Sequence, residues 1–505
     1  MTSARPHVFV LTGDCLRASS ATRRTMPFVN QTADVEFRNC YSPGTWTLPA
    51  HASLYSRRSP IEHGASRRGD RLHSEQAILP RKARQRGYRT VLCSENPMFS
   101  RLVGFNAGVD STNDSINFKL LPADFSPELL VNDLTPAEIR FLLGELVSRP
   151  QRVRNAINLA YGALSYLGSD ADPDSFPHHG DRVLSQLSSI VGRSPRRPIF
   201  AVTNLLDTHN PHYTAPEAGT KPLGLSFSRA EREALQGVSN AEVLFGDARL
   251  SPRARAVFGS WSKFYERQQQ VYVAQIRYLD ALIEDWMRSL DAAVLADSLV
   301  VVTGDHGQLF GEEGMVGHHT SLHPNGIGVP LFVKTPESWS DPSSKEANGG
   351  PSSRTIETPL SLVGLSKALD GVVRGEISDT TEFIVAATTS EERVVVVADG
   401  PTWDVARLRE RYGEGPVQEL AVRKVGVIER DRQTVYACRW DKSAITRSEF
   451  RLGSPEDGSR TWIDGEADSD AAALTDRQRG WLVERTDGST IEKAATERLE
   501  RLGYL

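Results

Sequence analysis

Five short hydrophobic runs, rich in β-branched residues, occur in the first two thirds of the chain, and each is followed by a polar or glycine-containing turn. The runs span residues 7–13, 90–94, 198–206, 298–304 and 329–334. Because their apolar positions are nearly continuous, they are typical of strands buried on both faces. Helical patterns precede two of them, at Ala77–Arg86 and at residues 262–291. Strands that alternate with helices predict an α/β fold with a mostly parallel sheet sandwiched by helices.

Two regions depart from this alternation. Residues 110–195 have a helical and irregular pattern, which we interpret as an insertion beside the active-site face, and residues 336–357 are rich in Ser, Pro and Gly, which indicates a loop. After about residue 376, the runs EFIVAAT, RVVVVAD, KVGVIER and TVYACRW alternate with turns, and the last segment, TIEKAATERLERLGYL, has a helical pattern. We expect a catalytic domain over residues 1–375 and a C-terminal α+β subdomain over 376–505, with a small antiparallel sheet and a final helix.

Composition narrows the class of protein. The chain has 505 residues, 39% of them hydrophobic, and a net charge of -5 with no long basic stripe, so we expect a globular protein without a nucleic-acid or membrane partner. No stretch approaches the ~20 apolar residues that span a membrane. The first apolar run, Val8–Leu11, is too short for a signal peptide. Four cysteines without metal-binding spacing indicate free thiols, and hence a cytoplasmic location.

Polar residues follow three of the predicted strands. Asp14 ends the first run, Asp207 and His209 follow the third, and Asp305 and His306 follow the fourth. In open α/β sheets, ligands bind at the carboxyl ends of the strands, so these side chains are expected to face one site. Three strand ends that each carry Asp or His are stronger evidence for a common site than any single one.

The segment TGDHG suggests a metal site. In a glycine-flanked turn, Asp305 and His306 can both reach one divalent ion, for which a carboxylate and an imidazole are suitable ligands. The alternative is a surface turn capped by Asp305. Histidines that follow in the sequence favour a metal or anion site, and they are His318, His319 and His323. Asp14 is either a further ligand or a helix cap with Arg17 as its ion-pair partner.

Thr47 and two histidines are candidates for covalent and acid–base chemistry. Thr47 precedes Pro49 at the start of a helical pattern, where backbone N–H groups attract anions and a metal could activate the hydroxyl. The alternative is that Thr47 only caps the helix, and the residues alone favour the cap. His209 and His212, in NLLDTHNPHY, could bind an anionic oxygen or protonate a leaving group.

Taken in order, these segments resemble the sulfatase branch of the alkaline phosphatase superfamily. The strand ending at Asp14 resembles the first metal segment, TLPAHASLYSRRSP the nucleophile motif, GYRTVLCSENP the Gly-Tyr-x-Thr strand, TGDHG the second metal segment and RLERLGYL the closing segment. In this register Thr47 takes the nucleophile position, Pro49 the motif proline and His51 the place of an arginine. The resemblance implies an alkaline phosphatase-like fold and a metal-dependent hydrolase of phosphate or sulfate esters.

The sequence departs from that branch at several positions. Its usual nucleophile is a formylglycine made from Cys or Ser, which Thr47 cannot form; threonine nucleophiles occur in the phosphodiesterases and the phosphoglycerol and phosphoethanolamine transferases of the superfamily. Cys15 replaces a common second metal Asp, and the place of a substrate-binding lysine holds only Ser94, Glu95 and Asn96. The ligand set therefore resembles that of the transferases.

The resemblance implies the following site. One divalent ion, Ca, Mn, Mg or Zn, binds Asp14, Thr47, Asp305 and His306, and Thr47 forms a covalent intermediate. Side chains expected to touch a small-molecule or glycan ester, or to protonate its leaving group, are His51, His209, His212, His318, His319 and Asn96. Two alternatives stay open: a true sulfatase that uses an unmodified threonine, and a catalytically silent glycan- or partner-binding protein on the same scaffold.

Overall fold

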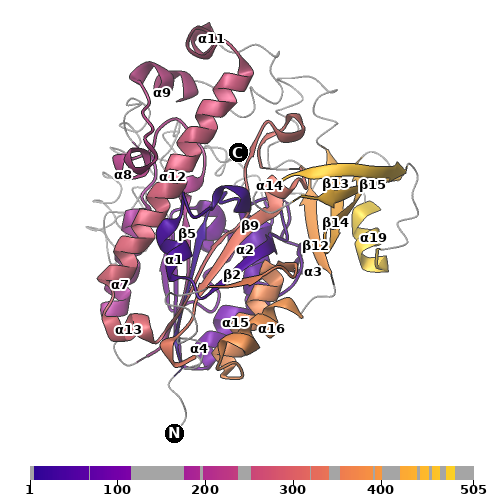
Figure 1. The fold of residues 1–505 in the computed structure, drawn as a ribbon. Coiled ribbons are helices and arrows are strands. Elements are labelled where there is room, and N and C mark those ends of the chain that lie inside the picture. The colour runs from indigo at the N-terminus through magenta and orange to yellow at the C-terminus, as the bar shows by residue number, and fades with distance from the viewer. Residues whose placement is uncertain are drawn as a thin grey trace, which may run out of the picture.

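The central feature of the computed structural model is a nine-stranded sheet with helices on both faces (Figure 1). The structure describes residues 5–67, 69–114, 176–193, 197–236, 252–318, 320–339, 353–389, 393–400, 421–440, 444–453, 458–466 and 474–483. Within these ranges the strands lie in the order β10-β2-β9-β6-β1-β5-β3-β4, and β11 pairs with β2.

The strands of this sheet are β1 (His7–Gly13), β2 (Val35–Tyr41), β3 (Arg89–Ser94), β4 (Ser111–Asn113), β5 (Ile199–Leu205), β6 (Ser298–Gly304), β9 (Gly328–Lys334), β10 (Arg354–Ile356) and β11 (Leu360–Ser361). Strand β9 is antiparallel to both of its neighbours, β6 and β2. The other pairings, including β1 with β5 and β6, are parallel. The mostly parallel sheet predicted from the hydrophobic runs is therefore confirmed.

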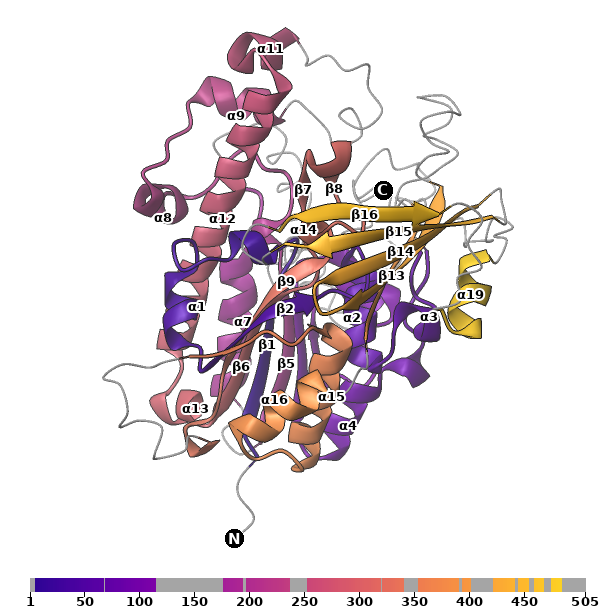
Figure 2. The same cartoon turned by 45° about the vertical axis from the view of Figure 1, so that its right-hand side comes forward.

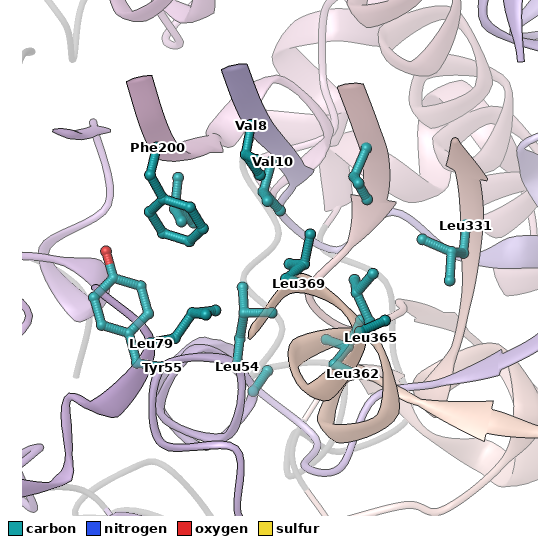
Figure 3. Packing of buried hydrophobic residues seen from close by; sticks show 14 of the residues in the cluster. Val8, Val10, Leu54, Tyr55, Leu79, Phe200, Leu331, Leu362, Leu365 and Leu369 are labelled. Carbon is teal, nitrogen blue, oxygen red and sulfur yellow. The ribbon is translucent and has the colours of Figure 1, made fainter. Parts of the chain in front are cut away.

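Helices cover the sheet on both sides, which explains the continuous hydrophobic runs. Val8 and Val10 of β1 face the helices α2 (Thr47–Ser56), α4 (Ile78–Gln85) and α15 (Leu362–Arg374), whereas Phe9 and Leu11 face α1 (Pro27–Thr32), α7 (Gly180–Gly192) and α12 (Trp261–Ser289). Figure 3 shows the first of these layers, where the side chains of β1, β5 and β9 meet leucines of α2 and α15. Each such side chain, when fully buried, contributes about 1.5–3 kcal/mol to folding.

Shorter elements surround these layers. The remaining α-helices are α3 (Pro60–His63), α8 (Glu217–Thr220), α9 (Arg229–Gln236), α11 (Pro252–Phe258), α13 (Ala292–Ala296), α14 (Pro324–Ile327), α16 (Thr380–Thr388) and α19 (Asp476–Val483). A two-stranded hairpin joins β7 (Leu309–Phe310) to β8 (Val316–Gly317). Among the described helices, none combines the length and the hydropathy that a bilayer crossing requires.

A second, antiparallel sheet lies beside the first and runs across its upper edge in Figure 2. Its strands are β12 (Val394–Asp399), β13 (Val422–Glu429), β14 (Arg432–Arg439), β15 (Ile445–Leu452) and β16 (Arg460–Glu466). One face packs on Ile61 and Leu482, and the other on Leu322 and Ile327. Val397 of β12 also pairs with Gly44, so the sheet is joined to the loop that precedes α2.

The predicted strand EFIVAAT is wrong, because these residues form most of helix α16. The helix begins after Asp379, whose side chain accepts the backbone N–H of Glu382 at 2.8 Å, and it packs against α15 with Phe383 and Ala387 fully buried. Its β-branched residues favour a strand locally, but a cap and a four-residue spacing of buried positions outweigh that preference. Val385 is left 51% exposed.

The predicted insertion over residues 110–195 also differs in detail. Residues 111–113 form β4, which pairs with β3, and residues 180–192 form α7. Most of the predicted insertion (115–175), most of the predicted loop (340–352) and the predicted final helix lie outside the described residues.

Replacing Asp379 with alanine should destabilise the protein by about 1 kcal/mol, because helix α16 loses its N-terminal cap. Chemical denaturation of the two proteins measures this difference. Asp379→Asn is the matched control, since an amide oxygen still accepts the Glu382 N–H, and it should lose much less. Equal losses in both variants would contradict a capping role.

Candidate active site

The carboxyl ends of neighbouring strands bring the predicted polar residues together. In register, Gly13 of β1 lies between Leu205 of β5 and Gly304 of β6, so the residues that follow β1 and β6 emerge side by side. The ligand atoms of Asp14, Asp305 and His306 all lie within 4.8 Å of one another. The strand-end prediction thus locates a real cluster, and all three side chains are buried.

Asp14 is the centre of this cluster. Its Oδ2 atom accepts hydrogen bonds from Asn96 Nδ2 at 2.5 Å, Asn204 Nδ2 at 3.1 Å and Thr47 Oγ1 at 3.2 Å. Burial by itself would raise the pKa of Asp14, but nearby histidines and the two amides hold this pKa below its ordinary value. Asp14 is therefore an ionised carboxylate. Arg17, expected as its ion-pair partner, instead pairs with Glu312 at 2.8 Å.

Thr47 directs its hydroxyl into the cluster. It is the first residue of α2, and the residue before it, Trp46, makes no side-chain cap. Thr47 Oγ1 donates to Asp14, accepts from Asn96 Nδ2 at 3.2 Å and lies 3.5 Å from His306 Nε2. The hydroxyl is thus engaged with the cluster, and the helix-cap alternative does not describe its contacts.

A close backbone approach sets the start of α2. A Cβ atom on Gly44 would lie 2.6 Å from Pro49 Cγ, so only glycine allows the loop to pass over the first turn of the helix. The proline fits in this first turn, where its missing N–H is not needed. Together these residues fix where the Thr47 side chain enters the site.

The turn after β6 orients Asp305 and His306. Asp305 Oδ1 accepts the backbone N–H groups of Cys15 at 3.1 Å and of His306 at 2.8 Å. His306 Nδ1 donates to the carbonyl of Gly307 at 3.0 Å, which leaves the Nε2 lone pair facing Asp14 Oδ1 at 3.5 Å and Asp305 Oδ2 at 3.6 Å. Burial, and then the negative charge of Asp14, raise the pKa of Asp305 well above its ordinary value.

The chemistry of these donors fits a divalent cation. Two buried carboxylate groups and an imidazole lone pair converge on one space, and such an arrangement is unfavourable unless a positive charge lies between them. Asn204 adds a buried Oδ1 atom with no hydrogen-bond partner among the described residues. Carboxylate oxygens with one imidazole are suitable ligands for several divalent ions.

His51 lies one turn after Thr47 on helix α2. His51 Nδ1 lies 3.1 Å from the carbonyl of Thr47 and His51 Nε2 lies 3.1 Å from Thr12 Oγ1, while the ring stacks on Phe99 with centroids 4.0 Å apart. Burial lowers the pKa of His51 to about 4. Only 1% of the His51 surface is exposed, and its contact with the Thr47 carbonyl lies within the first turn of α2.

His209 and His318 lie at the more open side of the cluster. His209 Nδ1 donates to the carbonyl of Asn210 at 2.7 Å, and His209 Nε2 points toward Asp14 Oδ1 at 4.0 Å. The His209 side chain is 15% exposed, whereas that of Asp14 is fully buried. The His318 ring lies 4.4 Å from that of His306 and 5.4 Å from that of His209. A ligand that reaches the cluster past these rings would contact both.

Other predicted residues are not gathered at the cluster. His212 is buried, with Nδ1 donating to Gln275 Oε1 at 2.7 Å and Nε2 facing Gln308 Nε2 at 3.3 Å. Gln308 Oε1 in turn lies 3.0 Å from His318 Nδ1, so His212 is linked to His318 through Gln308. His319 lies outside the described residues.

Two acidic residues near the site, Glu95 and Asp207, have their contacts outside the cluster. Glu95 accepts the backbone N–H groups of Leu206 at 3.0 Å and His179 at 2.9 Å, so it ties the end of β3 to its neighbours. Asp207 packs against Gly180 at the start of α7, and burial, followed by the charge of Glu95, raises its pKa well above the ordinary value. Neither carboxylate belongs to the cluster of Asp14, Asp305 and His306.

Sequence reasoning did not identify Asn204, which bonds to Asp14 at 3.1 Å and lies 3.5 Å from Asp305 Oδ2. The sequence does show a polar amide side chain within a mostly apolar strand. A buried amide requires hydrogen-bond partners, so this residue could have been noted. The partners themselves come from other strands, so the sequence could flag the residue without giving its role.

Stability should fall when the pH drops from about 7 toward 4, because buried histidines resist protonation. Burial lowers the pKa of His63 from 6.5 to about 4 and that of His212 to about 3. As the pH falls below about 6.5, these histidines bind protons in the unfolded chain but stay neutral in the folded chain. The free energy of unfolding therefore decreases as the pH drops. We expect a loss of about 2 kcal/mol per histidine at about pH 5. Denaturation midpoints across pH test this, and His63→Gln should show a smaller loss.

Comparisons with known proteins identify a family match and several proteins of similar fold. A family model described as Sulfatase matches residues 6–365. The phosphonate monoester hydrolase of Agrobacterium radiobacter has a similar structure, with a TM-score of 0.57 and 16% identity over 90% of this chain and 91% of that chain. A 2-O GAG sulfatase gives a TM-score of 0.53 and 11% identity over 89% and 85% of the two chains.

A third similar structure is a complex of a protein with its substrate D-glucosamine-2-N, 6-O-disulfate, with a TM-score of 0.55 and 11% identity over 99% of this chain and 98% of that chain. At these identities the structural likeness establishes the fold. No curated protein matches the sequence. The family match covers the strands and turns that supply Asp14, Thr47, Asp305 and His306.

Proposed function

The chain belongs to the sulfatase family, whose members are hydrolases of sulfate and phosphate esters, and we propose that it cleaves a phosphodiester or phosphonate monoester through a covalent intermediate on Thr47. One divalent ion, held by Asp14, Thr47, Asp305 and His306, completes the proposed site. The observation that carries the proposal is the Thr47 hydroxyl, which lies 3.2 Å from Asp14 Oδ2 and 3.5 Å from His306 Nε2 at the start of a helix.

The choice of phosphorus over sulfur follows from the nucleophile. Threonine carries a methyl group on Cβ and cannot become the formylglycine aldehyde, so its own oxygen must form the ester intermediate. The enzyme is regenerated when water, or another hydroxyl acceptor in a transfer reaction, attacks the transferred group. In the superfamily that the sequence resembles, threonine nucleophiles occur in phosphodiesterases and in phosphoglycerol and phosphoethanolamine transferases, which act on phosphorus esters.

In the first step, Thr47 Oγ1 forms a bond to phosphorus and its proton passes to Asp14 Oδ2, which accepts that hydrogen bond at 3.2 Å. The bond from phosphorus to the leaving oxygen breaks, and the leaving oxygen takes a proton from His209 Nε2. A bound divalent ion would act as a Lewis acid that stabilises negative charge on the nucleophile and on the transferred group. Asn96 holds both Asp14 and Thr47, which keeps the hydroxyl oriented.

In the second step, water attacks phosphorus and loses a proton to His209. The bond between phosphorus and Thr47 Oγ1 breaks, and Thr47 regains its proton from Asp14. The enzyme then returns to its starting state, with one water consumed and with one alcohol and one phosphate monoester or phosphonic acid released. His318, beside both His209 and His306, is placed to bind an oxygen of the transferred group.

His209→Gln should slow the cleavage of substrates with poor leaving groups far more than that of good ones. An alkoxide needs a proton as it departs, and general acid catalysis typically contributes about 10²–10⁴-fold. We expect a loss of about 10²-fold for an alkyl phosphodiester, and little change in the cleavage step for a p-nitrophenyl ester. Single-turnover rates with both esters measure the difference. An equal loss for both would exclude an acid role for His209.

A substrate panel tests the proposed function as a whole. The purified protein is assayed with p-nitrophenyl phosphonate, bis-p-nitrophenyl phosphate, p-nitrophenyl phosphate and p-nitrophenyl sulfate, each with Ca²⁺, Mn²⁺, Mg²⁺ or Zn²⁺. Preferential turnover of the phosphorus diester or phosphonate supports the proposal, whereas preferential sulfate turnover supports a sulfatase with an unmodified threonine. Absence of both turnover and bound metal supports a silent binding protein. Product analysis with glycerol present separates hydrolysis from transfer.

The cysteines support a cytoplasmic location as part of the proposal. Cys15, Cys40, Cys93 and Cys438 are all buried and form no disulfide with one another. A reducing compartment is where unpaired buried thiols are commonly found.

A further inference from the structure

We propose that the thiolate of Cys15 is a further ligand of the metal centre, so that the resident ion is thiophilic, with Zn²⁺ favoured over Ca²⁺ and Mg²⁺. This inference rests on the proposed ion at Asp14, Asp305 and His306, and it concerns which ion the protein selects.

The position of the sulfur carries the inference. Cys15 Sγ lies 3.4 Å from Asp14 Oδ1 and 3.4 Å from His318 Nδ1. Its sulfur also forms a group with the ligand nitrogens of His306 and His318, in which all ligand atoms lie within 4.8 Å of one another. Asp14 Oδ1 and His306 Nε2 are themselves only 3.5 Å apart. An ion that touches both is therefore close enough to the sulfur for a bond of about 2.3 Å.

The backbone holds the thiol in this direction. Cys15 has a φ of 61°, in the left-handed region that a cysteine rarely adopts. Two hydrogen bonds hold this backbone conformation. The Cys15 N–H donates to Asp305 Oδ1 at 3.1 Å, and the Cys15 carbonyl accepts the Tyr272 hydroxyl at 2.7 Å. Strained residues of this kind occur most often at functional sites. The turn after β1 thus presents Asp14 and Cys15 to one point.

The thiol is buried and lies against a proposed ligand, with Cys15 Sγ 3.4 Å from Asp14 Oδ1. A divalent ion bound at this point would convert the thiol to a thiolate, because ligation stabilises the deprotonated sulfur. On binding, the sulfur–hydrogen bond breaks, the proton leaves to solvent and the sulfur lone pair bonds to the ion. No oxidation or reduction takes place.

The ligand chemistry then selects the ion. Thiolate, imidazole and carboxylate ligands together suit Zn²⁺, whereas Ca²⁺ and Mg²⁺ prefer oxygen ligands alone. Without the sulfur, Asp14, Asp305 and the Thr47 hydroxyl would leave the site dominated by oxygen. The Cys15 thiolate would therefore change the preferred ion from Ca²⁺ or Mg²⁺ to Zn²⁺.

Cobalt substitution tests the proposed bond directly. The full-length protein is stripped of metal and titrated with Co²⁺, whose absorption in the near ultraviolet shows a thiolate-to-cobalt charge-transfer band only when sulfur is bound. We expect the band in the wild type and in Cys93→Ser, which alters a buried thiol in strand β3. We expect no band in Cys15→Ser. Cys15→Asp, which supplies an oxygen ligand in place of sulfur, should shift the ratio of Zn²⁺ to Mn²⁺ affinity toward Mn²⁺.

Each outcome decides a separate question. Visible d–d absorption without the charge-transfer band means that Co²⁺ binds away from sulfur, which overturns the role of Cys15 and leaves the proposed metal site intact. A band that persists in Cys15→Ser assigns the sulfur to another cysteine and also overturns the inference. Failure of the wild type to bind Co²⁺ at all overturns the metal site on which the inference rests.

Discussion

Thr47→Ala should abolish turnover, with a loss of about 10⁴-fold or more in kcat, because alanine has no oxygen to form the covalent intermediate. The fold should survive, since the Thr47 hydroxyl bonds only to residues of the site and α2 keeps its buried Leu48 and Leu54. The ion should still bind through the carboxylates and His306. The expected result is thus an inactive protein that retains its metal.

The intermediate itself is the direct measurement. A reaction with a phosphonate ester is quenched in acid during the first turnover, and the peptide that contains Thr47 is weighed by mass spectrometry for the added phosphonyl group. Thr47→Ser is the matched control, because its hydroxyl can still attack and should keep the adduct. Turnover by Thr47→Ala near the wild-type rate would refute covalent catalysis at this residue.

Asp305→Asn should remove the ion from the site. Asparagine keeps the shape of the side chain, and its Oδ1 atom can still accept the N–H groups of Cys15 and His306, so the turn should remain folded. What is lost is one negative charge at the cation. Mutations of groups that only support metal ligands lower affinity by about 10–100-fold, so loss of a directly bound negative charge should exceed about 100-fold.

Calorimetry and metal analysis measure this change, and thermal unfolding gives an independent test. An ion at 100 times its dissociation constant should stabilise the wild type by about 2.7 kcal/mol, and this increment should vanish in Asp305→Asn. Asp280→Asn is a matched control at a buried aspartate that accepts the N–H of Val29 and belongs to none of the possible ligand groups among the described residues. An unchanged ion increment in Asp305→Asn would exclude Asp305 as a ligand.

Much of the central sheet was predictable because its strands carry their own signal. β1, β5 and β6 are covered on both faces by helices, so nearly every position is apolar and the runs are visible without tertiary information. Their ends were visible for the same reason, and this located Asp14 and Asp305–His306. The pairing order was not predictable, because the antiparallel placement of β9 between β6 and β2 depends on partners far along the chain.

Other features depended on contacts that the sequence does not display. Helix α16 has the local preferences of a strand, and only the Asp379 cap and the packing of Phe383 on α15 make it helical. Thr47 was selected by the family resemblance, since an isolated threonine before a proline looks like a cap. Asn204 gains its role from Asp14 and Asp305, which follow two other strands.

The pairing of Gly44 with Val397 has a consequence for biosynthesis. A ribosome delivers the chain from its N-terminus, so the loop that leads into Thr47 emerges long before strand β12, to which it bonds through the Val397 N–H and the Pro43 carbonyl at 2.9 Å. A nascent chain that ends at residue 365 would contain the whole segment matched by the family model but not this strand. The loop that leads into Thr47 therefore gains this backbone pairing only after β12 has been synthesised, later than every residue of the proposed site.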